Sequence, residues 1–89
     1  MGTRKRDTVP VTMRAVIQRI NRRLKREHDH GERNWEFLKA TRGDRWRSEL
    51  GDYYLVNVDR NAIVDKQVDP EEFARELGVL APYERVEAL

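Results

Sequence analysis

The 89-residue chain contains no cysteine. Disulfides, thiolate zinc sites and cysteine nucleophiles are therefore excluded. Its five glycines are scattered singly, so the chain also lacks a glycine-rich loop that could cradle phosphates. A protein without cysteine fits a reducing compartment, and we expect a cytoplasmic location.

Long apolar runs are also missing. No stretch approaches the roughly 18 apolar residues of a membrane span. The basic start MGTRKR is not followed by the apolar segment of a signal peptide, and Arg6 stands where N-myristoylation requires Ser or Thr. We therefore expect no association with a membrane.

Charge is abundant and unevenly distributed. Charged residues make up 38% of the chain, but the apolar residues fall in periodic clusters, which argues against disorder. Residues 1–30 hold nine Lys/Arg against three Asp/Glu, whereas residues 51–89 hold four against nine. This asymmetry favours either mutual attraction of the two halves, within or between chains, or a polyanion-binding face.

Residues 12–27 predict a long helix with Thr12 as its N-cap and an end near Glu27 or His28. Its apolar side chains recur at steps of three and four and form one stripe: Met13, Val16, Ile17, Ile20 and Leu24. Basic residues occupy most of the remaining surface. They form either a solvated back or a phosphate-contacting face, while adsorption to a membrane is disfavoured because the apolar stripe lacks aromatic anchors.

The two histidines flank Asp29 in the polar segment EHDHGERN, residues 27–34. Residues at i and i+2 do not share a helix face, and His28 and His30 have no further His or Cys to complete a zinc site. We therefore interpret the segment as a loop and predict no metal.

The segment WEFLKAT, residues 35–41, is predicted as a strand. Alternation places Trp35, Phe37 and Lys39 on one side and sets Leu38 on the other. A continuation of the helix is the alternative.

The stretch TRGDRWRSELG contains the adhesion tripeptide Arg42-Gly43-Asp44, but nothing in the chain indicates export. We interpret it as a connection with one helical turn, capped by Asp44 and ended by Gly51. Trp46 and Leu50 share its inner side, so Trp46 is predicted as a core anchor whose burial tests the interpretation.

Residues 52–68 predict a β-hairpin around Asp59-Arg60-Asn61, with Asn61 in the left-handed position. Pairing Val58 with Ala62 gathers a core face that consists of Tyr54, Val56, Val58, Ala62 and Val64. The other face is half apolar and is left for the C-terminal tail or another subunit to cover.

Residues 69–78 carry the signals of a short helix. Asp69 is the predicted N-cap, Pro70 the first helical residue and Glu72 the partner in a capping box. Gly78 is expected to end the helix, and Phe73 is expected on its buried edge.

Together these elements predict an α+β fold of order α-β-β-β-α. A small antiparallel sheet, which includes the hairpin 52–68, carries the long N-terminal helix and the short C-terminal helix. Residues 1–11 are predicted as a mobile basic arm, 12–80 as a single domain and 81–89 as a tail with Tyr83 and Val86 against it.

At MRAVIQRINRRL, and again from GDYYLVNVDRN to VDPEEFARELGVL, the chain resembles a group of short hypothetical bacterial proteins that are often encoded near mobile elements. The resemblance covers about residues 13–80. It implies a bacterial cytosolic origin, and it implies neither an activity nor any site residues.

No enzyme motif is present, and neither a cofactor nor a small-molecule ligand is predicted. The leading hypothesis is a protein–protein interaction module or homodimer, with the basic helix as a surface for an acidic partner. The alternative is a nucleic-acid-binding accessory or regulatory protein that uses the basic helix. The candidate contacts for an acidic partner or nucleic acid are Arg14, Arg19, Arg22, Arg23, Lys25, Arg26, Arg45 and Arg47.

Overall fold

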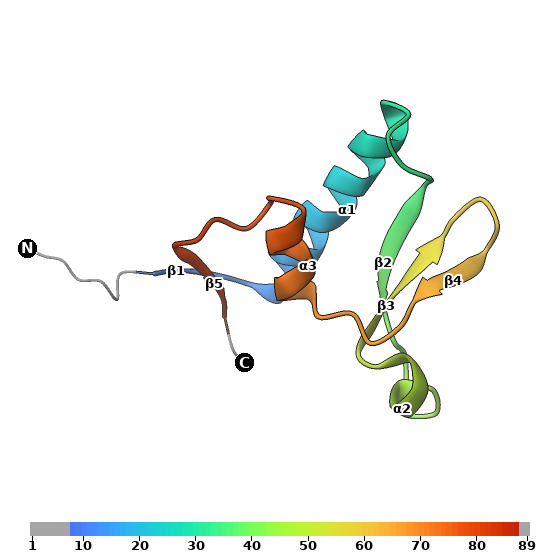
Figure 1. The fold of residues 1–89 in the computed structure, drawn as a ribbon. Coiled ribbons are helices and arrows are strands. Elements are labelled where there is room, and N and C mark those ends of the chain that lie inside the picture. The colour runs from blue at the N-terminus through green and yellow to red at the C-terminus, as the bar shows by residue number, and fades with distance from the viewer. Residues whose placement is uncertain (1–7, 88–89) are drawn as a thin grey trace, which may run out of the picture.

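A computed structural model describes residues 8–87 (Figure 1). Within them the elements follow in the order β1 (Val9–Val11), α1 (Met13–Asp29), β2 (Glu36–Ala40), α2 (Arg47–Leu50), β3 (Tyr53–Asn57), β4 (Ala62–Asp65), α3 (Pro70–Glu76) and β5 (Glu84–Val86). Strands β2, β3 and β4 form an antiparallel sheet, and β1 pairs with β5 in parallel. The predicted α+β class is confirmed, while the predicted order lacks β1, α2 and β5.

Helix α1 forms as predicted. The Thr12 hydroxyl accepts a hydrogen bond from the Ala15 amide at 3.1 Å, which satisfies one of the unpaired amides of the first turn. Val16, Ile20 and Leu24 are fully buried, so the apolar stripe faces the core. This helix is the largest single contributor to the core.

The helix continues to Asp29, slightly beyond the predicted end. Its last turn is held by contacts that the polar composition of the segment does not reveal. The His28 ring stacks on Trp35 with centroids 5.7 Å apart, and Lys25 pairs with Asp29 at 2.9 Å. His28 is therefore a helical residue that packs on Trp35, the residue just before β2. The loop between α1 and β2 is shorter than expected.

Residues 36–40 form a strand, which settles the choice between strand and helix. Leu38 is only 1% exposed beneath α1. The Asn21 carboxamide donates to the Leu38 carbonyl at 3.1 Å and accepts from the Leu38 amide at 2.7 Å. Asn21 therefore occupies both backbone groups that an additional strand would use at this point of the sheet edge.

The hairpin forms with a register different from the predicted one. Ala62 pairs with Asn57 and Ile63 with Val56, and a β-bulge follows between Val56 and Leu55. The Val58 amide instead donates to the Trp35 carbonyl at 2.8 Å. Asn61 has a φ of 54°, so the left-handed turn position is confirmed.

The predicted core face is wrong for two reasons. Helix α1 covers the face of β3 that carries Leu55, so Tyr54 and Val56 lie on the other face. In addition, moving β4 by one residue turns its side chains to the opposite face of the sheet and places Ile63 beside Val56. All four residues of β4, including Val64, are exposed, and so is Val58.

The prediction that Trp46 is a core anchor is also wrong, because half of its surface is exposed. Helix α2 is a single turn, and Trp46 stands at its N-cap position, where it lines a groove with Tyr54 of β3 and Ile63 of β4. Its backbone carbonyl accepts from the Leu50 amide at 2.8 Å, and Gly51 ends the turn as predicted.

The last residues of the predicted arm and part of the predicted tail belong to the fold. Val9–Val11 pairs with Glu84–Val86, and Val11 joins the core. Val86 packs against the core as expected, but Tyr83 is 62% exposed. The remainder of the predicted arm, residues 1–7, lies outside the described residues.

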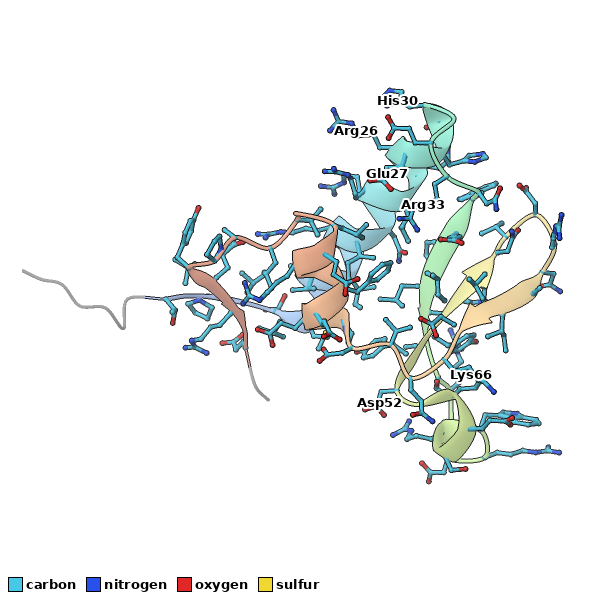
Figure 2. All side chains as sticks on the ribbon, in the orientation of Figure 1. Arg26, Glu27, His30, Arg33, Asp52 and Lys66 are labelled. Carbon is cyan, nitrogen blue, oxygen red and sulfur yellow. The ribbon has the colours of Figure 1, made fainter. Side chains whose placement is uncertain are left out.

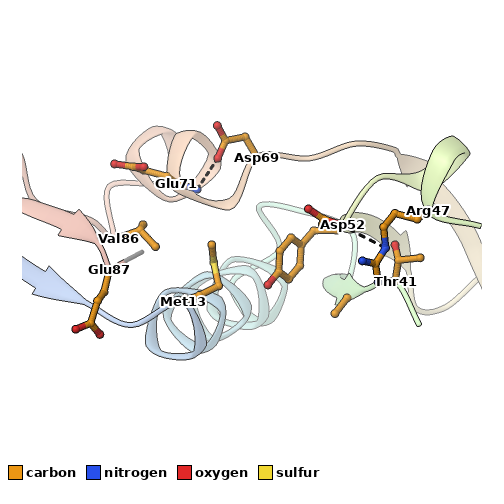
Figure 3. Close-up of a pocket in the computed structure, with 10 residues that line it drawn as sticks. Met13, Thr41, Arg47, Asp52, Asp69, Glu71, Val86 and Glu87 are labelled. Carbon is orange, nitrogen blue, oxygen red and sulfur yellow. Dashed lines mark hydrogen bonds and ion pairs between the residues drawn. The ribbon is translucent and has the colours of Figure 1, made fainter. Parts of the chain in front are cut away.

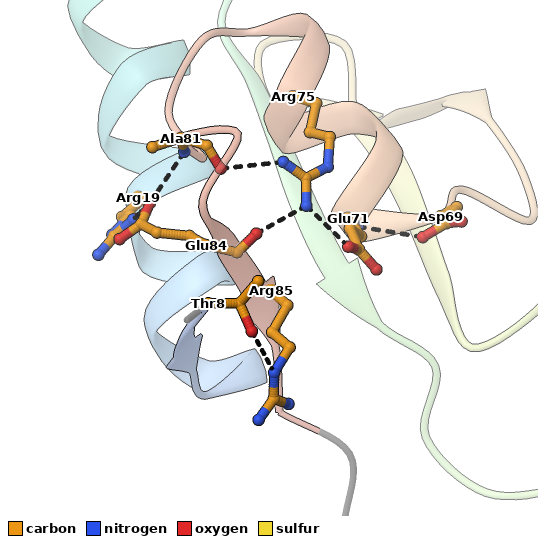
Figure 4. Close-up of polar contacts among 8 residues, drawn as sticks. All are labelled: Thr8, Arg19, Asp69, Glu71, Arg75, Ala81, Glu84 and Arg85. Carbon is orange, nitrogen blue, oxygen red and sulfur yellow. Dashed lines mark hydrogen bonds and ion pairs between the residues drawn. The ribbon is translucent and has the colours of Figure 1, made fainter. Parts of the chain in front are cut away.

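Two arginines attach the segment after α3 to the helices (Figure 4). Arg75 donates to the carbonyls of Ala81 at 3.0 Å and Glu84 at 2.8 Å. Arg19 of α1 reaches the Glu84 carboxylate at 2.9 Å and the Val79 carbonyl at 3.1 Å. These contacts hold the chain in position to form β5 beside β1.

Helix α3 begins as predicted, with the Asp69 carboxylate accepting from the Glu71 amide at 3.0 Å and Pro70 as its first residue. Gly78 follows it with a φ of 75°. No helix within residues 8–87 has the length and apolar character needed to cross a membrane.

Candidate binding surfaces

The three-stranded sheet has one face covered by α1 and one face left open within residues 8–87. Leu38 and Leu55 are paired and lie on the covered face. Phe37, Val56 and Ile63 are paired across the strands and therefore share the opposite face. Phe37 is 42% exposed and Ile63 is 51% exposed.

Trp46 extends this open face toward α2. A groove of 550 Å³ lies between Trp46, Tyr54 and Ile63. The Arg45 guanidinium lies 5.3 Å from the centre of the Trp46 ring, and Lys66 pairs with Glu49 at 3.7 Å beside the groove. Figure 2 shows Lys66 at the end of the sheet nearest α2. We call Phe37, Trp46, Tyr54, Val56 and Ile63 the open sheet face.

The sequence interpretation missed most of this surface. It correctly separated Phe37 from Leu38, but it predicted Tyr54 and Val56 on the core face and the side of Leu55 as the uncovered one, which is the reverse of the structure. It predicted Ile63 and Val56 on different faces of the hairpin, because the assumed turn was one residue too short. The exposed Trp46 could not be anticipated from its i, i+4 spacing to Leu50.

Four of the candidate arginines lie together on α1. Arg19, Arg22, Arg23 and Arg26 follow the spacing i, i+3, i+4 and i+7, and with Val79 they line a hollow of 210 Å³. Figure 2 shows Arg26 on the side of α1 that points away from the sheet. We call these four residues the arginine row.

The other candidate residues lie elsewhere. Arg14 and Lys25 are on the exposed side of α1 but do not line the hollow of the arginine row. Arg45 covers Trp46, and Arg47 lies 3.6 Å from Asp52. Arg45, just before α2, therefore adjoins the open sheet face, and Arg47 lies at the start of α2; both are separate from the arginine row.

Two members of the arginine row are held by carboxylates. Arg19 pairs with Glu84, and Arg23 pairs with Glu27 at 2.9 Å. The hydrogen bond from Arg19, with a further one from the Ala81 amide, lowers the pKa of Glu84. Hydrogen bonds from Arg23 and then Arg33 lower the pKa of Glu27.

Replacing Glu84 by glutamine is expected to reduce stability at neutral pH and to have less effect in acid. A carboxylate whose pKa is lowered by folding stabilises the fold above its unfolded pKa, which is about 4.3. That contribution disappears as the pH falls through the lowered pKa of Glu84. Urea midpoints measured from pH 7 to pH 3 should therefore converge for the wild type and Glu84→Gln.

The control is Glu76→Gln, which removes an exposed carboxylate that forms no ion pair within residues 8–87. Its difference from the wild type should change less with pH. A constant difference between wild type and Glu84→Gln across the whole range would contradict the expected contribution of the ion pair.

A depression of 640 Å³ lies where α1, α2 and α3 approach one another (Figure 3). Its polar lining consists of Thr41, Arg47, Asp52, Asp69, Glu71 and Glu87. Asp69 caps α3, Glu71 pairs with Arg75 at 3.0 Å, and the Thr41 hydroxyl donates to the Gly51 carbonyl. Thr41, Asp69 and Glu71 therefore already have partners within the fold.

The histidines do not converge on a common point. His28 packs on Trp35, and its Nδ1 lies 3.2 Å from the Arg33 carbonyl, while His30 forms the exposed C-cap of α1. Among residues 8–87, no group of three or more His, Cys, Asp or Glu side chains is placed to hold a metal ion.

Comparisons with protein families, curated proteins and solved structures find no match for this chain. The open sheet face and the arginine row are therefore the features from which a function can be inferred.

Proposed function

We propose that the protein is a non-enzymatic, cytoplasmic binding module that forms a homodimer through its open sheet face. The observation that carries this proposal is the gathering of three aromatic and two aliphatic side chains on a face that no part of residues 8–87 covers. Contiguous exposed apolar patches are characteristic of interaction sites. Aromatic side chains are also enriched at the centres of protein interfaces.

A second copy is the occupant that this surface fits best. The rim carries both signs of charge, with Lys39, Arg45 and Lys66 close to Glu49 and Asp65. A two-fold axis can bring each sign opposite the other, because both partners of such a dimer use the same patch.

The surface is small. Three strands of about five residues cover roughly 14 by 17 Å. Even with Trp46 added, the contact lies near the lower end of stable interfaces, which bury about 1,000 Å² in total. We therefore expect a reversible dimer with a Kd of about 1–100 μM.

Replacing Phe37 by lysine should raise the dimer Kd by at least about tenfold, because it places a charge in the centre of the apolar contact. Sedimentation equilibrium or light scattering between 5 and 500 μM measures this change. Tyr83→Ser is the matched control, because it removes an exposed aromatic residue that lies beyond the sheet. A wild-type protein that stays monomeric at 500 μM would refute the proposal.

A further inference from the structure

The arginine row places four positive charges within two turns of α1. Like charges at i, i+3 and i+4 destabilise a helix, so this arrangement has an electrostatic cost. Arg19 and Arg23 are compensated by Glu84 and Glu27. Within residues 8–87, no ion pair involves Arg22 or Arg26.

All four arginines line the same hollow, two of them held by carboxylates and two with no ion pair within residues 8–87. Glu84 and the Val79 carbonyl fix the position of the Arg19 side chain, and Glu27 fixes that of Arg23. Arg22 and Arg26 lie on the same stripe, and within residues 8–87 their guanidinium groups form no hydrogen bond, which leaves donors for a ligand. The hollow of 210 Å³ therefore presents two oriented and two available guanidinium groups to an anion.

We propose that the arginine row binds the phosphodiester backbone of a nucleic acid. Arg19 and Arg26 are seven positions apart in the sequence, which corresponds to about 10 Å along the helix axis. Successive phosphates of one duplex strand advance by about 3.4 Å, so the row extends over about three of them. Planar guanidinium groups match phosphate oxygens in a bidentate geometry. This function goes beyond self-association and does not depend on it.

The chemistry around the row distinguishes nucleic acid from the other polyanions of a cell. The exposed side chains of α1 are all polar: Arg14, Gln18, Arg22, Lys25, Arg26 and Asp29. A protein interface has an apolar centre, and an amphipathic helix binds a membrane through an exposed apolar face. Here the apolar stripe of α1 is buried under the sheet, and Val79 is the single apolar residue of the hollow.

The row lies on α1, which covers the side of the sheet opposite to the open sheet face, although Arg22 also lines a hollow with Phe37 at the edge of β2. A dimer formed through the sheet would therefore carry one row on each outer side. Arg14 and Lys25 lie on the same exposed helix and can add further phosphate contacts. Because the proposed contacts are to phosphates, which carry no sequence information, binding is expected to be independent of sequence.

The experiment is fluorescence anisotropy with labelled 20-base-pair DNA and RNA duplexes between 50 and 200 mM KCl. We expect the logarithm of the association constant to fall linearly with the logarithm of the salt concentration, with a slope of about −3 to −4. The double variant Arg22→Gln/Arg26→Gln should reduce this slope by about 2 and weaken binding by about 10- to 60-fold at 100 mM salt. Arg22→Lys/Arg26→Lys should keep most of the slope.

The matched control is Arg60→Gln/Arg85→Gln, which removes the same charge from the hairpin turn and from β5. It should leave the slope within about 0.5 of the wild type. An equal loss in this control would show a response to net charge alone and would overturn the assignment. The same conclusion would follow from equal affinity for polyglutamate, or from a wild-type Kd above 1 mM in 50 mM KCl. Circular dichroism confirms that each variant is folded.

Discussion

Replacing Asn21 by leucine is expected to lower the free energy of unfolding by about 2–3 kcal/mol. The substitution removes two hydrogen bonds, one to the amide and one to the carbonyl of Leu38. Leucine has a similar volume and keeps water away from these groups, so both backbone groups lose a partner without gaining a replacement. Urea unfolding followed by circular dichroism measures the change.

Two further variants isolate the cause. Asn21→Asp keeps the acceptor for the Leu38 amide but replaces the donor to the Leu38 carbonyl by a carboxylate oxygen. Because this negative oxygen repels the carbonyl oxygen, the loss at neutral pH should be at least as large. Gln18→Leu places the same leucine on an exposed position of α1 nearly one turn earlier, and it should change stability by less than about 0.5 kcal/mol. Equal stability of Asn21→Leu and the wild type would show that the pairing contributes nothing.

This result bears on function as well as on stability. Asn21 occupies the amide and carbonyl of Leu38 on the edge of β2, and these groups could otherwise pair with another chain. Losing this contact is expected to increase nonspecific association through the edge, which is a different surface from the open sheet face. The Asn21→Leu variant should therefore aggregate even when Phe37→Lys is also present.

Replacing Gly51 by alanine is expected to cost about 3 kcal/mol or more. Gly51 has a φ of 75° and a ψ of −169°, a region that is essentially restricted to glycine. A Cβ at this position would lie 2.7 Å from the Gln67 Cα, and backbone cannot move aside as a flexible side chain can. The Gln67 amide also bonds to the Leu50 carbonyl at 2.7 Å, so a shift would break a second contact.

Gly43→Ala is the matched control, because Gly43 also has a φ of 75° but has open space where a Cβ would stand. Its cost is expected to be about 1 kcal/mol, from the unfavourable φ alone. The two urea midpoints give the comparison directly. If both variants lost the same stability, the close approach of Gln67 would have no energetic consequence.

The elements that follow local rules could be predicted from the sequence. The spacing of apolar residues and the hydroxyl of Thr12 determine α1, and Asp69 with Pro70 determines the start of α3. The left-handed conformation of Asn61 is also local. The arginine row shares this property, because residues three and four apart must meet on one side of any helix.

The tertiary structure alone decided which faces are buried. A hairpin register depends on contacts with neighbouring strands, and the bond from Val58 to Trp35 is one of them. One residue of slip in β4 was enough to place Ile63 on the face of Val56, while the packing of α1 on the sheet decided that Leu55 is buried. The open sheet face, and with it the proposed dimer contact, therefore follows from a choice that local spacing leaves undetermined.

Contacts distant in the sequence decided the rest. β1 is three residues long, contains Pro10 and pairs with a strand about 75 residues later, so no local pattern indicates it. Trp46 and Leu50 have the spacing of a buried pair, but a single helical turn could not carry the indole to the core. The sequence by itself determined the helices, their caps and the arginine row. The fold determined the sheet register, the exposure of Trp46 and the surface available to a partner, because these depend on which segments meet in space.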